Sequence, residues 1–159
     1  MSEHCVVDLR CSVLLLRAGA VLLCQRSSSV AFWTLPGGSP RPDESSPAAA
    51  VREVYEETGL KVTVDRVFMT LETISQPYAP HRRIEVIFEG SERDYTAVPR
   101  QLEEGLAPVF MPIKQLEGKD LRPPISQEVQ AFVEPRSGPA WANQWTVPWM
   151  SSPWLAEET

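Results

Sequence analysis

The sequence predicts an α+β fold in which helices cover both faces of one β-sheet. Segments with the alternation or the valine content of strands are interleaved with two segments that have helical spacing. A chain of 159 residues, 43% of them hydrophobic, is long enough to bury one core and does not require a second. We therefore expect one domain over residues 1–136, followed by a tail over residues 137–159.

The first part of the chain is expected to supply three strands. Residues 5–16 are rich in valine and leucine and predict a strand, which a turn at residues 17–20 connects to a returning strand over residues 21–25. A short strand is expected over residues 32–35. Residues 37–43 are expected to form a loop, which two prolines stiffen.

A helix is expected directly after this loop. Ser46 has the character of an N-cap with Pro47 at the first helical position, and Gly59 suits the left-handed residue at which a helix ends. Side chains at i, i+3, i+4 and i+7 spacing define one face: Val51, Val54, Tyr55 and Thr58. Acidic side chains are expected to gather on the opposite face: Glu53, Glu56 and Glu57.

The second half of the chain is expected to add further strands and a second helix. Strands are predicted over residues 61–73, 83–89 and 107–113, with a loop at residues 76–81 between the first two. Residues 125–133 have helical spacing. The order of these segments completes a sheet with helices on both faces.

The tail combines prolines with four large aromatic side chains: Trp141, Trp145, Trp149 and Trp154. Left in water together, these rings would form a sizeable apolar patch. We therefore expect the tail to pack on its own domain. The alternative is a contact in a homodimer, because tryptophan is enriched in the cores of interfaces.

Composition and charge exclude several classes of function. The net charge is −6, from 21 acidic and 15 basic residues, so no stable nucleic-acid partner is expected. No apolar run reaches about 18 residues, so no membrane span is expected, and the first ten residues do not form a signal peptide. The three cysteines form no C-x-x-C pair, which favours reduced thiols and a cytoplasmic location.

The acidic helix and the turn before it have the composition of a metal site. The glutamates are clustered and do not alternate with lysine, and Arg52 stands four residues before Glu56, where it is placed to brace a carboxylate. Residues 36–38 form a Pro-Gly-Gly turn, at which backbone can approach a ligand closely. Oxygen-only ligands favour Mg2+ or Mn2+ over zinc. The alternative is a solvated acidic helix face.

Residues 38–60 match one known signature at each of its defined positions. The signature is Gly-x5-Glu-x7-Arg-Glu-U-x-Glu-Glu-x-Gly-U, in which U is apolar, and the chain reads GSPRPDESSPAAAVREVYEETGL. The chain therefore resembles the Nudix (MutT-like) hydrolases, which cleave nucleoside diphosphates linked to another moiety and use divalent cations. This resemblance implies the Nudix fold, an α/β/α sandwich with a mixed β-sheet and a loop–helix–loop that holds the metal.

The resemblance also implies roles for individual residues. Arg52 would orient Glu53, and Glu44 would help to position water or metal. The general base is left open between Glu53 and a loop glutamate. The implied metal ligands are three carboxylates and one backbone carbonyl: Glu53, Glu56, Glu57 and Gly37.

The expected activity is Mg2+-dependent (or Mn2+-dependent) hydrolysis of a pyrophosphate bond in a small nucleotide. The substrate classes left open are a (d)NTP, a dinucleoside polyphosphate and a nucleotide sugar. Tyr78, 18 residues past Leu60, resembles the tyrosine of diadenosine polyphosphate hydrolases, whereas residues 110–128 resemble members that cleave nucleoside triphosphates. Arg26 and Arg82 are expected to contact phosphate.

Two alternative functions remain. The first is a Nudix module that binds a nucleotide as a sensor without catalysis, and the intact signature weighs against it. The second is an RNA 5′-pyrophosphohydrolase, and the acidic charge balance weighs against that.

Overall fold

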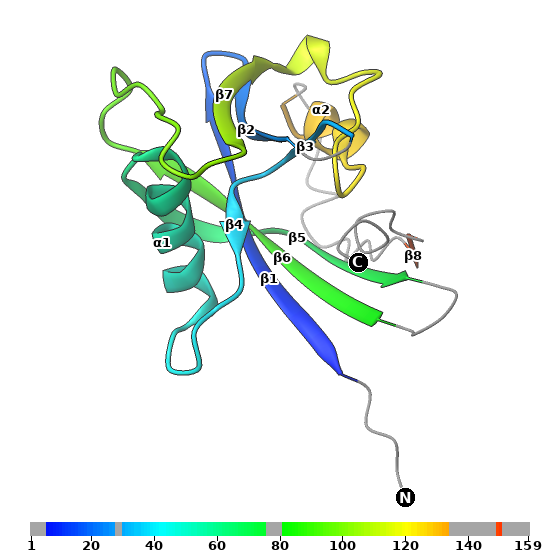
Figure 1. The fold of residues 1–159 in the computed structure, drawn as a ribbon. Helices are drawn as coiled ribbons and strands as arrows, with labels where there is room; N and C mark the ends of the chain where they lie inside the picture. Colours follow the sequence, from blue (N-terminus) through cyan, green and yellow to red (C-terminus); the bar gives the residue numbers. More distant parts are fainter. Residues whose placement is uncertain (1–5, 28–29, 76–80, 134–148, 151–159) are drawn as a thin grey trace, which may run out of the picture.

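The chain forms a mixed β-sheet with a helix on each side (Figure 1). The structure is a computed structural model, which describes residues 6–27, 30–75, 81–133 and 149–150. The strands are β1 (Val7–Arg17), β2 (Ala20–Arg26), β3 (Phe32–Thr34), β4 (Gly37–Gly38), β5 (Val62–Ser75), β6 (His81–Glu92), β7 (Leu106–Pro112) and β8 (Trp149–Met150). The helices are α1 (Ser46–Thr58), the 3-10 helix η1 (Ile113–Gln115) and α2 (Ser126–Val133). This arrangement confirms the predicted α+β fold.

The central strand of the sheet is β1, which pairs with three others. The strand order is β3-β2-β1-β6-β5-β8, and β4 and β7 pair with β1 and β2 respectively. The pairs β1–β6 and β5–β8 are parallel, and the other pairs are antiparallel. Cys11 lies opposite Gly38 on one side and Val86 on the other. The register therefore places Gly38, the first residue of the signature, beside β1 and one strand away from β6.

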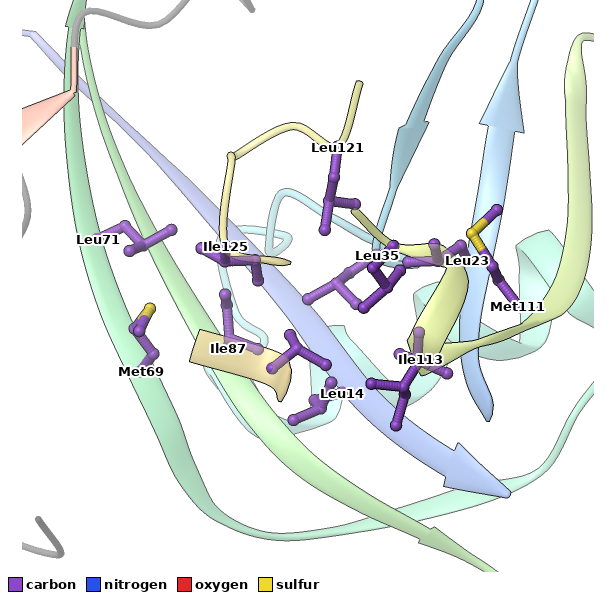
Figure 2. Close-up of a cluster of buried hydrophobic side chains, with 13 residues drawn as sticks. Leu14, Leu23, Leu35, Met69, Leu71, Ile87, Met111, Ile113, Leu121 and Ile125 are labelled. Atoms are coloured by element: carbon purple, nitrogen blue, oxygen red, sulfur yellow. The ribbon is translucent and has the colours of Figure 1, made fainter. Parts of the chain in front are cut away.

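Successive residues of β1 serve two hydrophobic cores, because alternate side chains of a strand point to opposite faces of the sheet. Leu14 belongs to the core that α2 covers (Figure 2), with Leu71 and Ile87 from the neighbouring strands. Val13 belongs to the core that α1 covers, which includes Val54. The prediction of a sheet covered on both faces is thus confirmed at the level of single side chains.

The ends of α1 are set by local chemistry, although the cap differs from the predicted one. Ser45, not Ser46, is the N-cap, and its hydroxyl accepts a hydrogen bond from the backbone N–H of Ala48 at 3.3 Å. Gly59 ends the helix at φ 75° and its N–H donates to the carbonyl of Tyr55, as predicted.

The buried face of α1 is rotated from the predicted one. Tyr55 is half exposed, and the buried residues are Ala49, Ala50, Val54, Glu57 and Thr58. The small alanines let the helix approach the sheet, which turns Glu57 inward and leaves the larger Tyr55 at the rim. The expectation that Glu57 shares a solvent-facing side with Glu53 and Glu56 is therefore wrong.

The expected loop at residues 37–43 is wrong at its start. Gly37 and Gly38 form β4, which pairs with Ser12 and Cys11. Two glycines carry no strand signal of their own, so this pairing depends on the approach of β1 and not on local propensity. The expected loop at 76–81 lies outside the described residues except for His81, which begins β6.

The expected tail lies outside the described residues except for Trp149 and Met150. These two residues pair in parallel with Glu72 and Thr73 at the edge of β5. Docking of the whole tail stays a prediction. None of the described helices is long and apolar enough to cross a membrane.

We expect Leu71→Ala to lower the free energy of unfolding by about 2–5 kcal/mol, because it leaves a cavity in the α2-side core. Leu71 is fully buried, whereas Val67 on the same strand is 48% exposed. The matched control Val67→Ala should change stability by less than about 0.5 kcal/mol. Urea denaturation followed by circular dichroism measures both, and equal losses would contradict the assigned core.

We expect removal of residues 137–159 to lower the melting temperature, because the tail then no longer pairs with β5. Removal of residues 151–159 alone retains β8 and serves as the control. Sedimentation velocity of both forms distinguishes a tail that packs on its own domain from one that holds a dimer. An unchanged melting temperature and mass in the longer truncation would contradict docking of the tail.

Candidate active site

The backbone at Gly37 and Gly38 is held between β1 and α1. A Cβ at Gly37 would lie 2.4 Å from the carbonyl oxygen of Cys11, and a Cβ at Gly38 would lie 2.5 Å from the carboxyl carbon of Glu53. Both distances are far below van der Waals contact. Gly37 has no room for a larger residue because the obstacle is the backbone of β1, whereas a larger residue at Gly38 would displace the carboxylate of Glu53. The consequence is that backbone amide and carbonyl groups, not side chains, face the carboxylates of α1.

Arg52 links three carboxylates of the candidate site. Its Nε and Nη2 donate to the two oxygens of Glu44 at 2.7 and 2.8 Å, a bidentate pair. Its Nη1 donates to Glu53 at 2.7 Å and to Glu56 at 3.0 Å. The spacing predicted the contact with Glu56, and the resemblance implied the contact with Glu53. The clamp on Glu44 across the loop was not foreseen.

This clamp fixes the charge of Glu44. The hydrogen bonds from Arg52, followed by the bond from the backbone N–H of Arg41, lower the pKa of Glu44 to about 2. Glu44 therefore stays ionised at neutral pH with both oxygens engaged by Arg52. Such a carboxylate is suited to holding Arg52 and the loop in place, and poorly suited to accepting a proton.

Glu57 is the buried carboxylate of the site, with 3% of its surface exposed. Its Oε2 accepts a hydrogen bond from the backbone N–H of Gly37 at 3.1 Å, and the thiol of Cys24 lies 3.9 Å from the same oxygen. Burial raises the pKa of Glu57 to about 7, while the positive charges of Arg10 and Arg26 oppose that rise. Its anionic form is thus poorly solvated, and a cation beside it would stabilise that form.

The donor set fits a hard divalent ion, because carboxylate and carbonyl oxygens supply it. Within the described ranges, no three acidic, histidine or cysteine side chains are close enough to enclose an ion as they stand. The charge of Glu53 is near enough to raise the pKa of Glu57 further. Glu56 is 46% exposed and paired with Arg52 and with Arg41 at 3.4 Å. The residues that would hold the ion are therefore Glu53, Glu57 and the backbone of Gly37. Glu56 would join them once its ion pairs with Arg41 and Arg52 are broken.

Three residues were predicted to contact the substrate: Arg26, Tyr78 and Arg82. The structure places one of them, Arg26, near this site. Arg26 on β2 is half-buried, and burial followed by the charge of Arg10 lowers its pKa while Glu57 raises it. Arg82 pairs with Glu72, opposite Val7 in β1. That position is four residues from Cys11, roughly 13 Å along the strand, so Arg82 does not join the cluster. Tyr78 lies outside the described residues.

Sequence reasoning missed a buried polar group on the other side of β1. Arg10 donates to the carbonyl of Leu35 at 2.9 Å and pairs with Glu85 at 3.4 Å. Ser12 donates to the same oxygen of Glu85 at 2.6 Å. The available signal was polar residues at alternate positions of a strand that is otherwise apolar, which indicates a polar patch on one face.

Comparison with known proteins relates this geometry to a family. Residues 8–132 match the model of the NUDIX domain. Human diphosphoinositol polyphosphate phosphohydrolase 3-alpha is 41% identical over 61 residues, which cover 38% of this chain and 37% of that protein. CTP pyrophosphohydrolase from Escherichia coli (strain K12) is 45% identical over 51 residues, 30% of this chain and 38% of that protein. The matched stretch thus spans less than two fifths of the length of these curated relatives.

Solved structures extend the likeness to the whole fold. The MutT protein from Methanosarcina mazei Go1 superposes with a TM-score of 0.66 at 23% identity, covering 82% of this chain and 96% of that one. The ORF135 protein from E. coli gives a TM-score of 0.65 at 23% identity, covering 87% and 93%. At such identity these structures support the fold alone. The family match over residues 8–132 establishes that the chain belongs to the Nudix family.

Proposed function

We propose that this protein is a Mg2+-dependent pyrophosphohydrolase of small nucleotides. The observation that carries the proposal is the buried Glu57 carboxylate, placed beside Glu53 and the Gly37 backbone. A solvated acidic helix face would leave all its carboxylates in water, and this one does not. Relatives named as a phosphohydrolase and a pyrophosphohydrolase match this chain over 61 and 51 residues and support the same reaction class.

Different residues of the chain would have different roles in such a reaction. A bound divalent ion would neutralise charge that develops on the phosphoryl oxygens and would lower the pKa of water. Arg52 fixes the loop through Glu44 and orients Glu53. Arg26, beside Glu57, is placed to contact a phosphate. Of Glu53 and the loop residue Glu44, Glu53 is the better candidate for general base, because both oxygens of Glu44 are occupied by Arg52.

The proposed substrates are a (d)NTP, a dinucleoside polyphosphate or a nucleotide sugar. The experiment that tests the function is a screen of these classes with Mg2+, scored by the products released, with a diphosphoinositol polyphosphate as a further member. We expect cleavage of a pyrophosphate bond in at least one nucleotide. Binding of a nucleotide without turnover would instead support the sensor alternative.

Glu57→Gln is expected to lower kcat about a hundredfold or more, since it removes an anionic ligand while keeping the shape of the side chain. The amide oxygen can still accept from the N–H of Gly37, so the fold should persist. The control is Glu117→Gln, at an exposed position outside the site. Steady-state kinetics under saturating Mg2+ measure the effect, and full activity of Glu57→Gln would contradict the proposed metal site.

Without metal, Glu57 is expected to make stability fall as pH rises. Its folded pKa of about 7 exceeds its ordinary value of 4.5, so the contribution is fully present below pH 4.5 and is lost as pH rises through 7. The loss amounts to about 3 kcal/mol at most. Unfolding of wild type and Glu57→Gln in EDTA at pH 5 and pH 8 measures it, with Glu57→Gln the more stable form at pH 8.

Added Mg2+ should then restore stability to the wild type at pH 8, by about 2.7 kcal/mol at a hundredfold excess over Kd. The Glu57→Gln protein should gain much less. If the stability of wild type and Glu57→Gln varied with pH in the same way in EDTA, Glu57 would not have the raised pKa. If Mg2+ stabilised both proteins equally, the ion would bind elsewhere.

A further inference from the structure

A row of polar side chains crosses the α2-facing side of the sheet beside the Glu57 site. The pairing of β1 with β6 places Arg10 opposite Glu85. The pairing of β6 with β5 places Leu71 opposite Glu85, and Thr73 opposite Arg83. Residues two apart on a strand face the same way, so Thr73 shares the face of Leu71, which belongs to the α2-side core. Glu85 and Thr73 are thus diagonal neighbours on one face.

This row is buried to a degree that stability alone does not explain. Arg10 is 7% exposed, Glu85 5%, Thr73 6% and Ser12 0%. Removing an ion pair from water costs several kcal/mol per ion, and apolar residues of similar volume are often equal or better for stability. Apolar residues at these positions could have extended the α2-side core, because Leu71 of that core lies directly opposite Glu85. A polar row at this place therefore indicates a polar ligand.

Two atoms of the row point to where a ligand would bond. Ser12 and Arg10 both contact Oε1 of Glu85, and no hydrogen bond from the described residues reaches Oε2. The hydroxyl oxygen of Thr73 is buried and likewise has no partner in the part of the chain that the structure describes. Diagonal neighbours on one face of a sheet are roughly 7–8 Å apart. One small group with hydrogen-bonding atoms on adjacent positions can bridge that distance.

The distance between the polar row and the candidate metal site matches the length of a nucleotide. Ser12, which bonds to Glu85, is the register partner of Gly37, which bonds to Glu57. Because β4, β1 and β6 are adjacent, Gly37 and Glu85 are two strand spacings apart and offset by two residues along the strands, roughly 12 Å in all. This is the scale that separates the phosphates of a nucleotide from its base.

We infer that Glu85 and Thr73 are specificity-determining residues that bind the non-phosphate half of the substrate through paired hydrogen-bond donors. The inference rests on the proposed function. Oε2 of Glu85 accepts one N–H or O–H, and the hydroxyl of Thr73 bonds to the adjoining polar atom. Arg10 and Ser12 are positioning residues, which hold the Glu85 carboxylate in place. Two sources offer this chemistry: the N1–H and N2–H edge of guanine, and the vicinal diol of a ribose.

The test compares KM and kcat of wild type, Glu85→Gln and Thr73→Val for GTP, ITP and 2′,3′-dideoxy-GTP with Mg2+. Both variants are expected to raise KM for GTP at least tenfold with kcat changed less than threefold. A guanine contact predicts that the loss shrinks for ITP, which lacks the N2 amino group. A ribose contact predicts that it shrinks for the dideoxy nucleotide. An unchanged KM for all three in both variants overturns the inference.

Two controls separate recognition from folding. Glu89→Gln makes the same change on the same strand, at a glutamate paired with the exposed Arg66, and should leave KM unchanged. Thr73→Val removes a buried hydroxyl without a described partner, so its melting temperature should hold or rise. A raised KM in a protein of undiminished stability cannot come from unfolding. A merely structural role for Thr73 would leave KM where it was.

A binding measurement keeps this inference distinct from the proposed function. GMP is titrated calorimetrically into each protein in EDTA, where no turnover occurs. We expect wild type and Glu89→Gln to bind GMP, and Thr73→Val to bind it at least tenfold more weakly. Absence of turnover with this result would reject the proposed function alone. Equal binding by wild type and Thr73→Val, or no binding by wild type, would reject the inference itself.

Discussion

Burial of the Glu57 carboxylate is the constraint on which the rest of the site depends. The alanines of α1 bring the helix close to the sheet, and this approach turns Glu57 inward toward Gly37 and Cys24. A charge in that position requires compensation, which comes from a backbone N–H and from two arginines on neighbouring strands. The glycines of β4 are equally necessary, since a larger residue at Gly37 would clash with the backbone of β1 and one at Gly38 would displace the Glu53 carboxylate.

The same strand, β1, connects the candidate metal site with the polar row proposed to recognise the substrate. Its odd-numbered residues Cys11 and Val13 pack under α1, whereas its even-numbered residues Arg10 and Ser12 face the other side and carry polar contacts. Arg10 acts electrostatically on Glu57 and pairs with Glu85. One strand thereby places the candidate metal site and the polar row at a fixed separation, independent of any loop.

Local rules predicted those parts of the molecule that local interactions determine. Gly59 ends α1 in the left-handed conformation that glycine favours. The four-residue spacing correctly predicted that Arg52 contacts Glu56. Long-range contacts decided what the sequence could not show. Gly37 and Gly38 become a strand only because β1 lies beside them, and Glu85 meets Ser12 across 73 residues of chain. Which face of α1 is buried followed from the size of the alanines, a packing property that the apolar spacing of Tyr55 did not reveal.

The buried pair of Arg10 and Glu85 has a consequence for how the chain finds its fold. The parallel pairing of β1 with β6 joins segments far apart in sequence, and such pairings form slowly because a long loop must close first. A slip of β1 by one residue would carry Arg10 and Ser12 into the apolar core under α1 and would place Cys11 and Val13 on the α2-facing side, beside Glu85. The polar residues proposed to position the ligand contact thus also penalise misaligned pairings of β1.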